Sequence, residues 1–150
     1  MSGHFRLAVV LRLREMAEES ARIELGHAVV GHQRAVSMVE AAERQVDEEL
    51  ASLGQLQRSR ARAGELQTAV DATAFAQRGV VSAQERLGKA SDALFEARRI
   101  LAEATRQREV VERLRDRFLA AERRAQDRLD TLTMAEIAST QHAVRARDRS

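Results

Sequence analysis

The sequence predicts an all-α protein in which two long helices fold back on each other as an antiparallel coiled-coil hairpin. The 150 residues contain no Pro, so no residue removes a backbone donor and uninterrupted helix is permitted. Apolar residues also recur on a seven-residue repeat in both halves of the chain. Because that spacing averages 3.5 residues, it keeps one narrow seam of a helix facing a partner helix. We expect a single coiled-coil domain over residues 1–150.

The first helix is expected over about residues 5–62. Its seam carries small and β-branched apolar side chains at heptad spacing, and a flanking column of Val and Leu broadens the stripe. Gly64 is a candidate end of this helix, because Gly is common just past a helix C-terminus. The seam residues on which this helix depends are Leu25, Ala35, Val39, Ala42 and Leu53.

The heptad pattern fades after the first helix, and we expect the turn within residues 63–73. Asp71 or Thr73 can cap the next helix. Ser82 and Glu85 have the spacing of a capping box just after Gly79, so a break in the helix is possible up to residue 81.

The second helix is expected to run to about residue 143. Its seam alternates large and small side chains, with Leu in one column and Ala in the other, which calls for a partner with the opposite alternation. The first half of the chain supplies that partner, so we expect an intramolecular hairpin and a monomer. The seam residues of this helix are Leu87, Leu94, Leu101, Val111 and Phe118.

A turn centred near residue 68 predicts which residues face each other. In that register large side chains meet small ones, and two charged seam positions form an ion pair that penalises slipped registers. The expected pairs are Leu94 with Ala42, Leu101 with Ala35, Leu25 with Val111, Leu11 with Ala125, and Arg14 with Glu122.

Composition excludes several classes of protein. The absence of Cys rules out a disulfide framework, and the apolar run from Leu7 to Leu11 is far shorter than a membrane span or a secretory signal. The net charge is only +2 despite the high isoelectric point, because nearly all basic residues are Arg and acidic residues are interleaved with them. We expect a cytoplasmic protein that does not bind nucleic acid.

No catalytic or cofactor-binding constellation is present. His27 and His32 lie about 140° apart around a helix, so their side chains do not converge on a metal. Gly88 and Lys89 lack the Gly spacing and the Ser or Thr of a phosphate-binding loop. We therefore expect no enzyme activity, no cofactor and no metal.

Both ends of the chain resemble the flagellar export protein FliJ family. The segment from Phe5 to Glu15 is similar to the family's "F-R-L … L-x-L-R" opening, which leads directly into a long helix. The segment from Glu122 to Asp130 resembles the closing "E … L-D-E" helix. The length and the two long antiparallel helices match as well, so the resemblance covers nearly the whole chain.

The resemblance implies a stalk whose terminal end inserts into the hexameric export ATPase ring. Other surfaces would contact the export gate protein and substrate chaperones, and the protein would lie peripheral to the inner membrane at the flagellar base. A basic end suits an acidic ring opening. The residues expected at that end are Phe5, Leu7, Leu11, Arg12, Leu13 and Arg14, with Leu129 and Asp130 opposite them.

Three alternatives remain open at the level of sequence. One is the equivalent stalk of a virulence-type type III secretion system. Another is a basic helical protein that binds nucleic acid, whose affinity would fall steeply with salt. The third is a structural scaffold in which two chains pair as a longer dimeric coiled coil.

Overall fold

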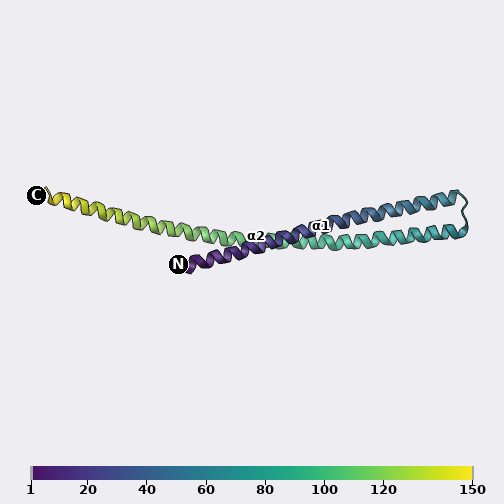
Figure 1. Ribbon diagram of the computed structural model, residues 1–150, viewed down its shortest axis with the longest axis horizontal. Coiled ribbons are helices and arrows are strands. Elements are labelled where there is room, and N and C mark those ends of the chain that lie inside the picture. Colours follow the sequence, from purple (N-terminus) through teal and green to yellow (C-terminus); the bar gives the residue numbers. More distant parts are fainter. Residues whose placement is uncertain (1, 150) are drawn as a thin grey trace. The chain divides into compact units, whose positions relative to one another are not determined.

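The computed structural model describes the backbone of residues 2–149 and the side chains of residues 7–149. It contains two helices, α1 (Ser2–Arg58, 57 residues) and α2 (Ala63–Arg147, 85 residues), and no strand in the described part of the chain. The chain reverses at a short loop, after which α2 runs antiparallel to α1 (Figure 1). The predicted all-α hairpin is confirmed.

The helices form two compact units. Unit 2 is the continuous segment Ala17–Ala104, which contains the loop and the helical arms on both sides of it. Unit 1 combines Met1–Met16 from α1 with Thr105–Ser150 from α2.

The end of α1 is set by Arg60, which adopts a left-handed backbone conformation with φ of 56°. The amide of Ala61 donates to the carbonyl of Leu56 at 3.2 Å, and the amide of Ser59 donates to Gln55 at 3.0 Å. A bond that reaches back five residues past a left-handed residue is the Schellman pattern of a helix C-terminus. The position is usually Gly, because a Cβ is strained there.

The start of α2 is set by Glu65. Its carboxylate accepts a hydrogen bond from the backbone amide of Arg62 at 3.2 Å, while the amide of Leu66 donates to the Arg62 carbonyl at 3.1 Å. This is the half of a capping box in which the third helical residue reaches back to the residue before the helix. Gly64 therefore lies inside the first turn of α2 and does not end α1.

The expected position of the turn was wrong, since it lies at residues 59–62 and not within 63–73. The possible break up to residue 81 is also absent, because α2 continues there as regular helix. Gly79 costs about 1 kcal/mol of helix propensity relative to Ala, but the strong helix formers around it outweigh that cost. The far end of α2 lies at Arg147, four residues past the expected end near 143.

Unit 2 has a core of small side chains. Its buried apolar residues are four alanines and one leucine: Ala21, Ala35, Ala76, Ala83 and Leu94. Two polar residues are buried with them, Glu18 and Thr73. Glu18 accepts a hydrogen bond from Arg22 at 3.0 Å, and the Thr73 hydroxyl donates to the Ala69 carbonyl at 2.9 Å. Small side chains bring the helices together but bury little apolar area.

The helix register differs from the expected one. In unit 2, Ala42 lies beside Ala72 and Ala76, not beside Leu94. In unit 1, Arg14 donates to Gln107 at 2.6 Å, so its expected ion pair with Glu122 does not form. The other expected pairs fail with these, because moving the turn shifts every pair by about two heptads.

Candidate functional site

The buried part of unit 1 surrounds Leu11 and Val111, which are 5% and 8% exposed. The hydrogen bond from Arg14 Nη1 to Gln107 Oε1 joins the two helices and places Leu11, one turn earlier, level with Val111. Leu11 was expected at the terminal end and Val111 in the seam. The structure brings these two together.

An exposed apolar stripe lies on α1 in unit 1. Val9, Leu13 and Met16 are 44%, 60% and 60% exposed, and their spacing of four and then three residues places them on one face of the helix. Only Leu13 was among the residues expected at this end. The sequence signal for Val9 and Met16 is that they are one heptad apart, on a side of the helix that does not belong to the seam.

The remaining expected residues of α1 are placed as follows. Leu7 is half-buried, whereas Arg12 and Arg14 are exposed. The side chain of Phe5 lies outside the described residues. Of the residues expected to enter the ATPase ring, some are therefore packed within unit 1 and others are exposed to solvent.

Charged side chains continue along the packed part of α2 in unit 1. Arg108 Nη1 donates to Glu112 Oε2 at 2.6 Å, with both side chains largely buried. Arg115 keeps its Nε buried without a hydrogen-bond partner, while its Nη2 lies 3.5 Å from Asp116. A buried guanidinium nitrogen without an acceptor carries a desolvation cost. The polar side chains in this part of the seam therefore do not fix one arrangement of the two helices.

Residues 121–147 of α2 form a helical extension, named here the C-terminal extension, in which every residue is exposed. The heptad positions continue into it as Ala125, Leu129 and Leu132, with the two leucines 58% and 62% exposed. In unit 1, these positions lie beyond the part of α2 that packs against α1 (Figure 1). The extension therefore carries a coiled-coil seam that α1 does not cover.

The expected placement of Leu129 and Asp130 opposite Leu11 and Arg14 was wrong. Leu129 lies 18 residues beyond Val111 on α2, about 27 Å along the helix. Asp130 accepts a hydrogen bond from Gln126 Nε2 at 2.9 Å within the extension. The physical reason is again the shift in register.

The ten residues predicted for the seam are all buried or half-buried. Ala35 and Leu94 belong to the core of unit 2, and Val111 to that of unit 1. The heptad pattern thus identified which side of each helix packs, even though the pairing across the seam differs.

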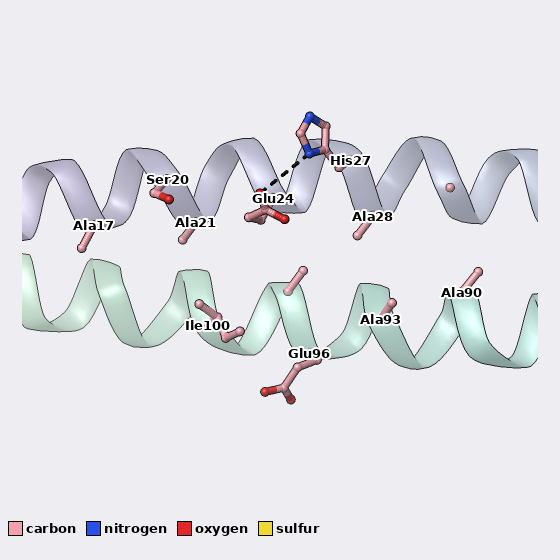
Figure 2. A pocket seen from close by; sticks show the side chains of 12 residues that line it. Ala17, Ser20, Ala21, Glu24, His27, Ala28, Ala90, Ala93, Glu96 and Ile100 are labelled. Atoms are coloured by element: carbon pink, nitrogen blue, oxygen red, sulfur yellow. Dashed lines mark ion pairs between the residues drawn. The ribbon is translucent and has the colours of Figure 1, made fainter.

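Unit 2 carries an apolar hollow of about 800 Å³, named here the alanine groove. It lies between residues 17–31 of α1 and 90–100 of α2, and alanine side chains from both helices border it (Figure 2). Two carboxylates stand at its rim. Glu24 lies 3.8 Å from His27 Nδ1, and Glu96 points away from the opposite helix (Figure 2).

Glu96 is held in its charged form by a neighbour on the same helix. Arg99 donates two hydrogen bonds to its carboxylate, from Nη2 at 2.6 Å and from Nε at 3.0 Å. These bonds, aided by the Arg99 charge, lower the pKa of Glu96 and raise the pKa of Arg99. Glu96 therefore keeps its negative charge at neutral pH, and Arg99 balances it.

The described residues contain neither a metal-binding cluster nor a membrane-spanning helix. No group of three or more His, Cys, Asp or Glu side chains is placed to hold a metal ion within residues 7–149. In the same part of the chain, neither helix has a stretch apolar enough to cross a membrane.

Taken together, the two antiparallel helices and their heptad seams define a coiled-coil protein. The family model of the flagellar FliJ protein matches residues 3–147, nearly the whole chain. The chain belongs to the FliJ family, and as a member it is a component of flagellar protein export. No curated protein matches the chain at a significant level.

Proposed function

We propose that the chain is the non-catalytic stalk of the flagellar export ATPase and that unit 1 carries the end that enters the hexameric ring. Family membership supports the flagellar setting over a virulence-type system. The hairpin architecture supports a mechanical role, because long packed helices transmit displacement along their axes.

The observation that carries this proposal is the C-terminal extension. Leu129 and Leu132 continue the seam of α2 with most of their side-chain surface in water. A heptad seam stabilises a helix only when another surface covers it, and exposed apolar stripes of this kind mark interaction sites. The wall of a ring would cover the extension from several sides.

Charge adds to the case for the same end. Arg12 is exposed on α1, and Arg145 and Arg147 occupy the last turn of α2. Basic side chains at the end of a helical stalk accelerate docking into an acidic opening and select its orientation. They also stabilise the C-terminus of α2 through its helix dipole.

The proposal extends to the other partners implied by the family. The stalk would connect the ATPase to the export gate protein, escort substrate chaperones, and lie peripheral to the inner membrane at the flagellar base. What supports these roles is membership of the family. No residue is assigned to the gate or to the chaperones.

The test uses the full chain and the export ATPase from the same genome. We expect the two to co-purify and the chain to stimulate ATP hydrolysis. Leu129→Asp should raise the concentration needed for half-maximal stimulation about tenfold, as expected for a central contact. Its helix content should not change, because Leu129 makes no packing contact that the substitution would break.

Phe95→Asp is the matched control. Phe95 is 72% exposed but lies in unit 2, so its variant should stimulate the ATPase as the unmodified chain does. The proposal fails if the unmodified chain does not bind the ATPase, or if Leu129→Asp binds and stimulates without loss.

A further inference from the structure

One face of unit 2 carries both the alanine groove and an exposed aromatic side chain. Phe75 is 72% exposed and lies three heptads before the groove residue Glu96, which places both in one column along α2. A second hollow of about 360 Å³ lies beside Phe75, where Ala42 belongs to the same heptad column of α1 as Ala28 of the alanine groove. The aromatic ring and the groove therefore face the same side.

A single chain cannot bring these two features together. Phe75 and the middle of the groove are 20 residues apart on α2, about 30 Å along a rigid helix. A protruding ring and an empty apolar hollow on one face are complementary only between two molecules.

We propose that two copies of the chain pair through this face in antiparallel orientation. Phe75 of each copy then enters the alanine groove of the other, beside Ala93 and Ala97. A two-fold axis passes near residue 85 of α2, so one pattern of contacts occurs twice. The occupant of the alanine groove is thus a second copy of the chain.

The charges on α2 fit this arrangement. The antiparallel pairing places Arg78 opposite Asp92 of the second copy and Arg99 opposite Asp71, positions that flank the contact as interhelical ion pairs do in coiled coils. Near the axis Glu85 lies opposite Glu85 of the second copy, and Arg86 of each chain flanks this like-charge pair. The two outer pairs, Arg78 with Asp92 and Arg99 with Asp71, join opposite charges.

A positively charged side chain lies beside the aromatic ring of Phe75. The Arg78 guanidinium lies over the Phe75 ring, 5.9 Å from its centroid, at the distance of a cation–π contact. When Phe75 enters the groove, this cation approaches the rim carboxylate of Glu96. The α1 side of the pairing is less favourable, because Glu24 lies opposite Glu48 of the second copy.

The area of the contact follows from the length and width of the paired face. Residues 71–99 extend about 42 Å along α2, and a face two helices wide gives about 800 Å² per copy, the standard size of a specific interface. Several of its residues are charged, and area alone does not give high affinity. We therefore expect association in the micromolar range.

The first experiment is sedimentation of the full chain over about 1–200 µM, a range that brackets micromolar association. The 16.7-kDa chain should become a dimer as concentration rises. Phe75→Asp should weaken the dimer at least about tenfold. Phe95→Asp is the control, because Phe95 is equally exposed but lies about 100° around α2 from the column of Phe75 and Glu96, and it should leave the association unchanged.

The second experiment exchanges charges. Arg78→Glu and Asp92→Arg should each weaken the dimer, and the double variant should restore it. These positions are 14 residues apart on one helix, about 21 Å, so they can compensate each other only between copies. The proposal is overturned by a monomer at every concentration, by equal effects of Phe75→Asp and Phe95→Asp, or by a double variant no stronger than the single ones.

Discussion

Replacing Leu94 with Ala tests whether the heptad seam holds unit 2 together. Leu94 is the one buried leucine among the core residues described in this unit and is only 8% exposed. Truncating a buried Leu to Ala costs about 2–5 kcal/mol of unfolding free energy, depending on how well the site closes around the cavity. The seam is only two helices wide and open at its flanks, so we expect the lower part of that range, about 2–3 kcal/mol.

The neighbouring residue provides the comparison. Phe95 is larger than Leu94 but is 72% exposed, so Phe95→Ala should change the free energy of unfolding by no more than about 0.5 kcal/mol. A rule based on hydrophobicity alone would predict the opposite order. The pair therefore separates packing in the seam from general apolar character.

The assay is urea unfolding followed by far-ultraviolet circular dichroism at low micromolar concentration, where association of chains contributes least. Hydrogen exchange of residues 17–104 would report on unit 2 alone, whether or not the two units unfold together. A loss below about 0.5 kcal/mol for Leu94→Ala, or a larger loss for Phe95→Ala, would refute the seam as the source of stability.

Three further predictions follow from local features. Arg60→Gly should stabilise the chain by about 0.5–1 kcal/mol, because Gly adopts the left-handed conformation without strain, whereas Arg44→Gly, at an exposed position inside α1, should cost about 1 kcal/mol; urea unfolding measures both. Glu18→Leu should leave the unfolding midpoint unchanged or raised, because burial of the Glu18 carboxylate carries a desolvation cost and its partner Arg22, which is 57% exposed, stays hydrated without it; a clear drop would contradict this reasoning. Arg99 lowers the pKa of Glu96, so the stability from that pair is present above the ordinary carboxyl pKa and is lost as pH falls through the lowered value. Thermal unfolding from pH 6 to pH 3 should therefore show a smaller acid dependence for Glu96→Gln, and an identical dependence would show that the pair contributes nothing.

The function could be anticipated from the two ends of the chain, but the geometry of the functional end could not. The segments around Leu11 and Leu129 carry the resemblance to the FliJ family, and the family match covers both. Their expected juxtaposition was wrong, because it depended on the position of the turn. Leu129 instead belongs to an uncovered extension, and the exposed stripe of Val9 and Met16 on α1 was not foreseen.

The sequence by itself determined the helices and the face of each that packs. Helix-forming composition and the absence of Pro make long helices the stable local structure, and the heptad spacing of residues such as Leu94 and Val111 selects the buried side. Both follow from interactions within a few residues along the chain. They do not depend on which partner residue lies opposite.

Tertiary structure decided the turn and the register. A heptad seam looks nearly the same after a shift of one or two repeats, so the pattern could not distinguish Gln107 from Glu122 as the neighbour of Arg14. The choice rests on the left-handed Arg60 and the cap formed by Glu65, which close the loop at residues 59–62. In that register α1 does not cover the C-terminal extension, whose seam residues Leu129 and Leu132 are exposed.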